Sequence, residues 1–362
     1  MKLFSCQHCA QILFFENVRC ERCQHALGYW PDDNVLSALE PDGDAWRALG
    51  VGNKRFRLCA NAAHDVCNWL VPADSPGTMC AACSHNRVIP ELNSPEHRFA
   101  WQKIEVAKHR LFYTIFRLNL AQTQNMLFAK EPLVFKFMDD APNSQQKVMT
   151  GHEAGTITIA LSEADDAERE QRRMAMREPY RTLLGHFRHE VGHYFWDRLV
   201  RDGNRLDDCR AVFGDDRQDY QEALKAHYAK GPPLDWQVNF VSAYATCHPW
   251  EDFAETWAHY LHIVDTLEMA SAFNLQLSPD IDKDGEFRVN QNINPYTTPT
   301  MQPLIDVWLP VTTALNTLSK TMGKDDLYPF ILSPPVVRKL DFIHNLVHSS
   351  VDRKPEPALQ AS

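Results

Sequence analysis

The chain has 362 residues, a formal net charge of −10 and a sequence pI near 5.9. That length allows two or three units, each large enough to bury a core. A phosphate-binding surface needs clustered positive charge, and only the run KRFR at 54–57 resembles one, so the composition argues against a nucleic-acid partner. No run approaches the ~18 apolar residues of a membrane span, and the first residues lack the apolar core and cleavage site of a secretory signal. We therefore expect a cytoplasmic protein that does not enter a membrane.

Cysteines dominate the first quarter of the chain, where eight of the ten lie within the first 83 residues. Two Cys-x2-Cys pairs, separated by ten residues, form the first set: Cys6, Cys9, Cys20 and Cys23. Two such tight turns present four thiolates to one tetrahedral ion and close it to water. The first set therefore predicts a structural zinc site.

A second set of cysteines follows, with an irregular first pair: Cys59, Cys67, Cys80 and Cys83. It predicts a second four-cysteine zinc site, in which His64 is an alternative to one of the thiolates. Disulfides are the competing explanation, and the absence of a secretory signal argues against them. Residues 1–93 carry eight Lys/Arg against ten Asp/Glu, so we expect this region to stabilise the protein or to receive a protein partner.

The cysteine-rich region ends near Asn93-Ser94-Pro95 and is followed by a change of pattern. A helical stretch is expected from 96 to 121, strands at 133–138 and 148–162, and a charged helix at 164–176. Residues 203–235 read as polar helix and loop. Proline-containing breaks near 278–303 and 329–335 separate C-terminal helices that include 311–322 and 336–347, and the last dozen residues are expected to be disordered.

The stretch 178–200 has the spacing of an amphipathic helix and carries the pattern His-Glu-x-x-His in its middle. Positions i and i+4 lie on one helix face, so His189 and His193 can bind the same metal ion. Glu190 can then reach a water on that ion and act as a general base. The pattern predicts a catalytic zinc site. His186, one turn earlier, is expected to lie on the helix face or to support a ligand, with direct ligation as the less favoured alternative.

A catalytic zinc needs a third protein ligand and one open position. The residues after His193 do not have the extended metzincin spacing, so the ligand must come from elsewhere. His248-Pro249 predicts the start of a second helix, on which Glu251 and Glu255 are four residues apart and share a face. We expect Glu251 to ligate zinc and Glu255 to accept a hydrogen bond from the free ring nitrogen of a liganding histidine.

Alternatives remain open on this second helix. The two glutamates can exchange roles, Asp252 or His259 can replace the ligand, or the carboxylates can merely favour the helix N-terminus electrostatically. Cys209 and Cys247 are expected to be unpaired thiols. Cys247 lies near the proposed site in sequence and is either a modulator of it or, as we favour, an inert buried thiol.

These motifs together resemble the gluzincin metallopeptidases, in which a His-Glu-x-x-His helix is followed by a glutamate ligand on a later helix. The string Glu251-Asp252-Phe253-Ala254-Glu255 is similar to the lethal-factor-type branch, where the first Glu is the ligand. In that branch a tyrosine seven residues before the ligand assists catalysis, and Tyr244 has this position. The resemblance implies that Tyr244 stabilises the oxyanion or helps the leaving amine, and a buried aromatic with a satisfied hydroxyl is the alternative.

Zincins also pair extended substrate backbone with an edge strand above the active-site helix. By this analogy the stretch Gly155–Leu161 is the candidate edge strand, and an ordinary core strand is the alternative of similar weight.

The whole chain is identified as a member of a bacterial family of zinc-binding metallopeptidases with an N-terminal zinc-ribbon domain. The resemblance rests on the cysteine pairs, residues 86–92, 151–166 and 242–265, and the active-site helix. It implies an α+β fold, with a zinc-ribbon region at 1–93, a mostly helical zincin-like domain with a small mixed sheet at 94–350, and a tail at 351–362.

The expected activity is zinc-dependent peptide-bond hydrolysis, with endopeptidase activity preferred because no anchor for a free amino terminus is evident. The expected cofactors are one catalytic and one or two structural Zn²⁺, and the expected partner is a peptide or protein substrate. Two alternatives remain: a zinc-ribbon binding module with a latent zincin domain, and a zinc hydrolase that acts on a non-peptide amide.

Overall fold

The computed structural model describes residues 1–123, 125–140, 148–176, 182–290 and 293–351. The chain divides into two compact units, one formed by 1–117 and 130–172 and the other by 118–129 and 173–362. The first unit therefore extends past residue 93 and includes the helix and sheet that follow the cysteines. The expected disordered tail lies outside the described residues from 352 onwards. Among the residues described, no helix combines the length and the apolar character needed to cross a membrane.

The cysteine-rich part of the first unit is built from short antiparallel strands. A hairpin of β1 (Phe4–Ser5) and β2 (Ile12–Leu13) precedes a five-stranded meander in which each strand pairs with the next. Its strands are β3 (Ala26–Trp30), β4 (Val35–Asp42), β5 (Ala45–Ala48), β6 (Arg55–Leu58) and β7 (Leu70–Pro72). Trp30 and Phe56 pack in its core with ring centroids 5.0 Å apart, together with Leu39 and Leu70.

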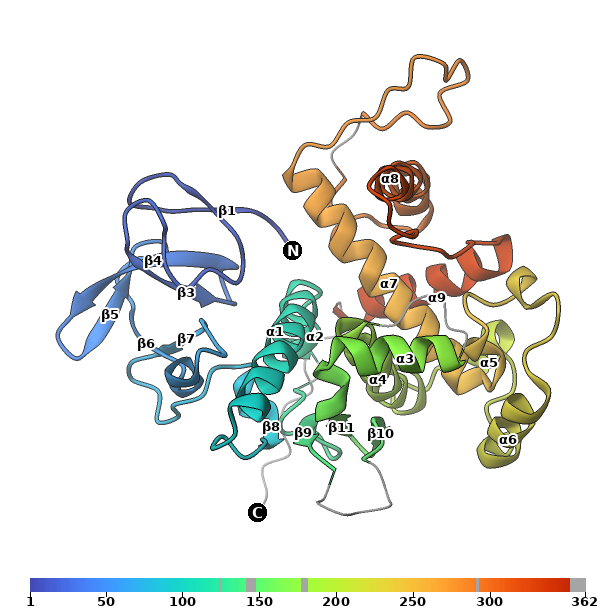
Figure 1. The fold of residues 1–362 in the computed structure, drawn as a ribbon, viewed down its shortest axis with the longest axis horizontal. Coiled ribbons are helices and arrows are strands. Elements are labelled where there is room, and N and C mark those ends of the chain that lie inside the picture. The colour runs from blue at the N-terminus through green and yellow to red at the C-terminus, as the bar shows by residue number, and fades with distance from the viewer. Residues whose placement is uncertain (124, 141–147, 177–181, 291–292, 352–362) are drawn as a thin grey trace. The chain divides into compact units, whose positions relative to one another are not determined.

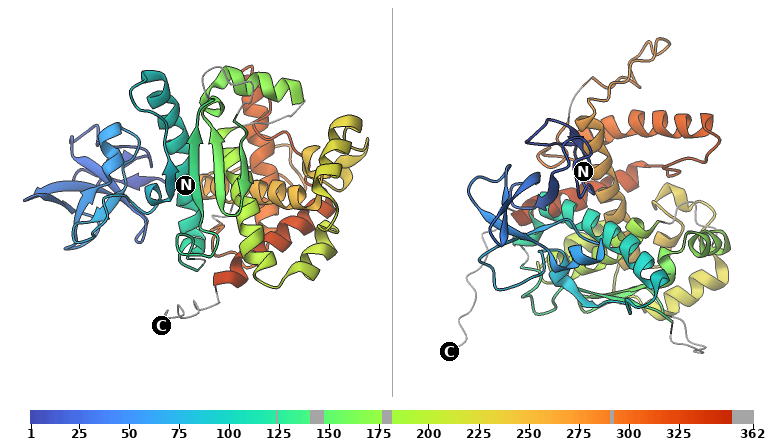
Figure 2. Two further views of the ribbon diagram at one scale, coloured as in Figure 1. Left: turned by 90° about the horizontal axis from the view of Figure 1, so that it is seen from below. Right: turned by 60° about the vertical axis from the view of Figure 1, so that its left-hand side comes forward.

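A second sheet and a long helix complete the first unit (Figure 2). The strands are β8 (Asn86–Val88), β9 (Val134–Met138), β10 (Gly151–Glu153) and β11 (Thr156–Ala160), in the order β10-β11-β9-β8. Helix α1 (Pro95–Arg117) buries Phe112 against Phe135 of β9, with ring centroids 6.0 Å apart. The sheet is mixed, because β8, β9 and β11 run parallel and β10 runs antiparallel to β11.

The expectation that Gly155–Leu161 forms an edge strand is wrong. Strand β11 has neighbours on both sides, and the edge next to it is β10. The predicted strand 148–162 is in fact a hairpin, since Ala154 and Gly155 turn the chain with φ of 44° and 81°. A Cβ at Gly155 would lie 2.5 Å from the carbonyl oxygen of Pro132, so this turn requires glycine.

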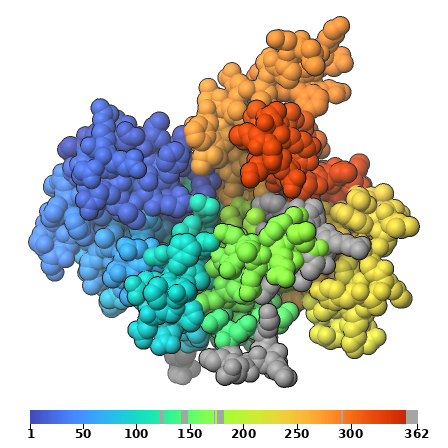
Figure 3. Space-filling view, in the orientation of Figure 1, coloured from blue at the N-terminus to red at the C-terminus, as the bar shows by residue number. Residues whose placement is uncertain are grey.

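The second unit is helical (Figure 1). It contains α2 (Leu120–Thr123), α4 (Leu183–Phe195), α5 (Leu206–Phe213), α6 (Tyr220–Lys230), α7 (Pro249–Ala272), α8 (Gln302–Thr321) and α9 (Pro334–Val351). Helix α3 (Asp166–Met176) spans the division between the units. In the space-filling view the segment between α7 and α8 stands out from the helices of its unit (Figure 3). Helix α8 begins well before residue 311, with Pro303 in its first turn and Pro310 inside it.

Helices α4 and α7 form the centre of this unit, and both begin at residues with a capping side chain. The Thr182 hydroxyl accepts a hydrogen bond from the Gly185 N–H, and the His248 ring accepts one from the Trp250 N–H. The start of α7 at His248-Pro249 is therefore confirmed. Beyond Phe195, α4 continues as a π-helical turn over Trp196–Arg201, which a regular helical pattern does not predict.

The α-plus-β prediction, with a strand-rich ribbon followed by a mostly helical part, is confirmed by these two architectures.

The close approach of α4 and α7 depends on Gly192. A Cβ on Gly192 would lie 3.0 Å from the Ala254 Cα and 3.2 Å from the Ala254 carbonyl oxygen. The glycine between the two histidines therefore brings the backbone of α7 against the helix that carries them.

Candidate metal centres

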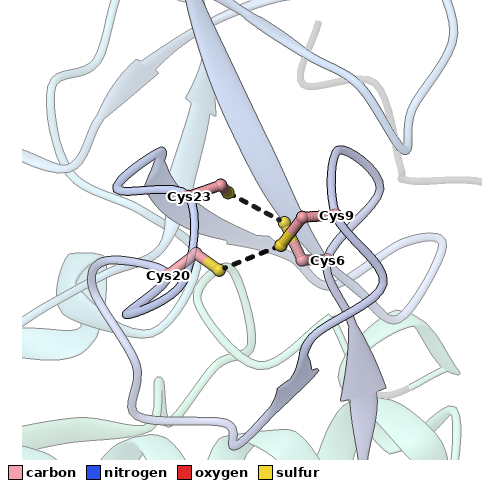
Figure 4. A group of neighbouring side chains, drawn as sticks. All are labelled: Cys6, Cys9, Cys20 and Cys23. Carbon is pink, nitrogen blue, oxygen red and sulfur yellow. Dashed lines mark hydrogen bonds between the residues drawn. The ribbon is translucent and has the colours of Figure 1, made fainter.

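The first four cysteines converge from two turns with matching backbone (Figure 4). Their sulfur atoms lie 3.6 Å apart for Cys6 and Cys23, and 3.6 Å apart for Cys9 and Cys20. A disulfide would need about 2.05 Å. A tetrahedral zinc with bonds of about 2.3 Å separates its sulfur ligands by about 3.8 Å, which is close to the spacing found. The geometry therefore suits a metal ion and not a cross-link.

Backbone N–H groups favour the thiolate form of Cys20. Against the effect of desolvation, the N–H groups of Cys23 and Arg22 lower the pKa of Cys20 to about 7. Against the effect of the His25 N–H, desolvation and the neighbouring thiols raise the pKa of Cys23 to about 12. The turns thus supply the spacing that a zinc ion requires and, at Cys20, a site that favours the charged form.

The second set of cysteines also converges, and all four of its members are buried. The Cys67 and Cys80 sulfurs lie 3.7 Å apart, and backbone N–H groups point to the sulfurs of Cys59 and Cys67 at 3.3 and 3.4 Å. His64 does not belong to the group, and its ring faces Trp101 instead. Desolvation raises the pKa of Cys67 and Cys80 well above the ordinary thiol value, so a buried quartet of thiolates needs a cation to balance it.

Helix α1 supplies part of the positive charge that balances these thiolates. The sequence did not indicate this contribution. Lys108 is fully buried and forms an ion pair with Glu105 at 2.8 Å. Burial alone would lower the pKa of Lys108, but Glu105 and Cys83 raise it above its ordinary value. His109 Nε2 lies 3.6 Å from the Cys83 sulfur. Because Lys108 already holds the Glu105 carboxylate, we treat these side chains as surroundings of the four-cysteine group and not as a separate metal site.

The third centre is formed by α4 and α7. The Nε2 atoms of His189 and His193 lie 3.2 Å apart, and Glu251 Oε2 lies 3.0 and 3.4 Å from them. A tetrahedral ion with bonds of about 2.0–2.1 Å separates its ligands by about 3.3 Å. The three atoms thus form a triangle of the size that a zinc ion needs.

Neighbouring side chains hold two members of this triangle, His189 and Glu251. Glu255 accepts a hydrogen bond of 2.7 Å from His189 Nδ1, which leaves Nε2 directed at the centre. The Ser242 hydroxyl donates to the other Glu255 oxygen at 2.6 Å, and Tyr220 donates to Glu251 Oε1 at 2.7 Å. Sequence reasoning missed Ser242 and Tyr220, since neither belongs to a motif.

The electrostatics of the triangle favour a cation. Despite burial, Glu251 and Glu255 hold the pKa of His189 well above its usual value. Despite burial, the two histidines hold the pKa of Glu251 well below its usual value. The carboxylates therefore stay ionised, as metal ligation and ligand support require.

Glu190 differs from the other two glutamates of the site. Its residue is 9% exposed, and within the described residues its carboxylate enters no hydrogen bond or ion pair. It is the next residue after His189 on the same helix, and it does not belong to the triangle. Such a carboxylate is available to a small polar molecule at the centre.

Aromatic side chains surround the triangle. The ring centroids of Trp250 and His193 are 3.7 Å apart, and those of Tyr244 and His189 are 5.9 Å apart. Burial raises the pKa of Tyr244 and of Tyr220 far above the ordinary value, so both hydroxyls keep their protons and act as donors.

The other residues considered from the sequence have different partners. Asp252 is fully buried and forms an ion pair with Lys339 at 2.6 Å, and His259 Nδ1 lies 2.7 Å from the Tyr328 hydroxyl. His186 is not part of the convergent group. Burial raises the pKa of Cys247 to about 11 and that of Cys209 to about 12, which leaves both as protonated thiols at neutral pH.

Two four-cysteine groups and one group of two histidines and a glutamate characterise a zinc-binding protein. A family model described as "Putative zinc-binding metallo-peptidase" matches residues 97–346, and a zinc-ribbon model matches residues 3–94. The chain belongs to this family of zinc-binding metallopeptidases with an N-terminal zinc ribbon.

Similar proteins come from mycobacteria. An uncharacterized protein of Mycobacterium bovis and one of Mycobacterium tuberculosis are each 40% identical over 349 residues, which is 96% of this chain and 95% of theirs. No solved structure matches the chain. The comparisons agree with the predicted family and with zinc binding. They do not identify the reaction, which is inferred below from the residues of the site.

Proposed function

We propose that the protein is a zinc-dependent endopeptidase of the gluzincin type. The observation that carries the proposal is the convergence of His189 Nε2, His193 Nε2 and Glu251 Oε2, in a centre whose helix α4 also carries the uncommitted carboxylate of Glu190. Three protein ligands leave one tetrahedral position open, which distinguishes a catalytic zinc from a closed structural one.

A zinc ion at this triangle would polarise a carbonyl oxygen and lower the pKa of a water to about 7. The chain's own residues then move the protons. Glu190 accepts a proton from the attacking water and passes it to the leaving amine. Glu255 keeps His189 in the tautomer that presents Nε2, and Ser242 keeps Glu255 in place.

Tyr244 is the proposed donor to the oxygen that gains negative charge when the peptide carbonyl is attacked. Its raised pKa keeps the proton on the hydroxyl, which a hydrogen-bond donor needs. Loss of one such donor typically costs about 3 kcal/mol of transition-state stabilisation.

We also propose that each four-cysteine group holds one structural zinc, which gives three ions in all. The free state of all ten cysteines fits a reducing compartment such as the cytoplasm. The ribbon would stabilise the protein or receive a protein partner, beside the peptide substrate of the catalytic site.

Glu190→Gln tests the proposal most directly. The amide keeps the shape of the side chain but cannot take a proton, so cleavage of a peptide library should fall about a hundredfold to ten-thousandfold while zinc content stays unchanged. Glu286→Gln, at an exposed position of a loop, is the matched control and should cleave like the wild type.

A metal-loaded Glu190→Gln protein that still cleaves at the wild-type rate would refute the general-base role. Absence of chelator-sensitive cleavage in the wild type would instead favour a latent, scaffold-like domain. Panels of small amides and esters would then reveal a hydrolase with a non-peptide substrate.

A further inference from the structure

The two cysteine turns of the first zinc site have the same backbone. In each, the residue after the second cysteine donates its N–H to the carbonyl oxygen of the first: Ala10 to Cys6 and Gln24 to Cys20, both at 2.8 Å. Ala10 and Gln24 also share a left-handed conformation, with φ of 60° and 63°. The turns can therefore be compared position by position.

This correspondence extends to the next residue along each turn. Cys6 donates its N–H to the carbonyl oxygen of Gln11, and Cys20 donates to that of His25, both at 2.9 Å. Gln11 is thus the counterpart of His25. Within the Cys-x2-Cys pairs, His8 is in the same way the counterpart of Arg22.

The side chains at these equivalent positions differ, and two of them, His8 and His25, lie next to Cys23. The rings of His8 and His25 come from different turns, yet their centroids lie 4.2 Å apart at an angle of 31°. One ligand atom from each of them and the sulfur of Cys23 lie within 4.8 Å of one another. Neither imidazole enters a hydrogen bond or ion pair in the part of the chain that the structure describes. Two imidazoles without polar partners thus meet beside one thiolate of the zinc site.

We propose that His8, His25 and the sulfur of Cys23 form a second, solvent-accessible zinc site that shares the Cys23 thiolate with the four-cysteine site. Imidazole and thiolate are the donors that zinc prefers, and a water would complete four ligands. Four thiolates around one divalent ion leave two negative charges in excess, and a second divalent ion attached to the same cluster would neutralise them.

The geometry also indicates that this ion would be held less tightly than the first. Tetrahedral ligands on zinc lie about 3.3–3.8 Å apart, and the three donors lie within 4.8 Å of one another, so they need to close by at most about 1.5 Å. His8 is exposed and His25 and Cys23 are half-buried, which permits that rotation. Occupancy of the shared site would then follow the free zinc concentration, while the four-cysteine ion stays bound.

The test uses the full-length protein with its tight zinc sites filled, titrated with further Zn²⁺ and followed by native mass spectrometry and competition with a zinc-sensitive dye. The wild type should take up one additional ion. His8→Ala and His25→Gln should each weaken that uptake by more than about tenfold, since even indirect supports of a metal ligand are worth about 10–100-fold in affinity.

The other turn supplies the controls. His25→Gln installs the residue that stands at the equivalent position in the first turn, so the turn itself should be retained. Arg22→Ala and Gln11→Ala remove the counterparts of the two histidines and should leave the additional uptake unchanged. Equal uptake in all five proteins, or equal loss in the histidine and control variants, would overturn the proposal.

Cadmium NMR separates a shared thiolate from an unrelated surface site. With ¹¹³Cd in both four-cysteine sites, the additional ion should shift the resonance of the site that contains Cys23 and leave the other unchanged. An additional ion without that shift would contradict the shared thiolate. Thiolate absorption of cobalt-substituted variants reports whether the four-cysteine site is intact, and if His25→Gln weakens it, the His8→Ala result decides.

Discussion

Tyr220→Phe removes one hydroxyl from the proposed catalytic site and leaves the ring in place. That hydroxyl donates to Glu251 Oε1 at 2.7 Å, and the Glu251 side chain is only 2% exposed. Water therefore cannot easily replace the lost donor. A hydrogen bond to a charged group is worth about 1.5–3 kcal/mol. At about 1.4 kcal/mol per tenfold change, the zinc affinity of the His-His-Glu site should fall about 10–150-fold.

Zinc affinity is measured by competition with chelators of graded strength, with the bound ions counted by metal analysis. Only the His-His-Glu site should lose zinc affinity, because the four-cysteine groups do not involve Tyr220. Tyr228→Phe is the matched control, since it lies on the same helix, is 63% exposed and should change nothing. Indistinguishable chelator curves for Tyr220→Phe and the wild type would refute the idea that this hydroxyl supports a metal ligand.

Three further changes test the packing and the charges of the helical unit. Gly192→Ala should destabilise it by about 1–3 kcal/mol in thermal unfolding, because the new Cβ would lie 3.0 Å from the Ala254 Cα, whereas Gly151→Ala meets nothing within 4 Å. Lys339→Met should cost about 3–5 kcal/mol in urea unfolding by leaving Asp252 buried without its partner. That cost should shrink as the pH falls, because burial already raises the pKa of Asp252 to about 7, and a cost independent of pH would contradict this account. Burial lowers the pKa of His344 from 6.5 to about 4, so the unfolded chain binds a proton that the folded chain excludes. The free energy of unfolding should therefore fall as the pH drops from 6.5 towards 4, and His344→Gln should flatten that slope, which an unchanged profile would disprove.

Spacing patterns in the sequence predicted those residues of the candidate sites that lie close together along the chain. The spacing of His189 and His193 depends only on helix periodicity, and the cysteine pairs depend only on tight turns. The start of α7 followed from His248-Pro249, and it placed Glu251 and Glu255 one turn apart. These residues converge in the structure as the sequence led us to expect.

Contacts between residues distant in the chain were not predictable in this way. Tyr220 reaches Glu251 across 31 positions, and Lys108 reaches the second cysteine group from the middle of a helix. The error at β11 has a similar origin, because whether a strand lies at an edge depends on its partners and not on its own residues. The π-helical turn after Phe195 likewise leaves no mark in the apolar spacing.

Because of the close contact at Gly192, main-chain atoms help to set the distances between the side chains of the His-His-Glu centre. Glu251 belongs to a helix that approaches α4 so closely at Gly192 that backbone atoms of Ala254, one turn further along, help to limit the spacing of the two helices. Main-chain atoms keep their size when side chains are exchanged. Exchanges of apolar side chains elsewhere on the two helices would therefore leave this backbone contact, and its part in the separation of the three converging atoms, in place.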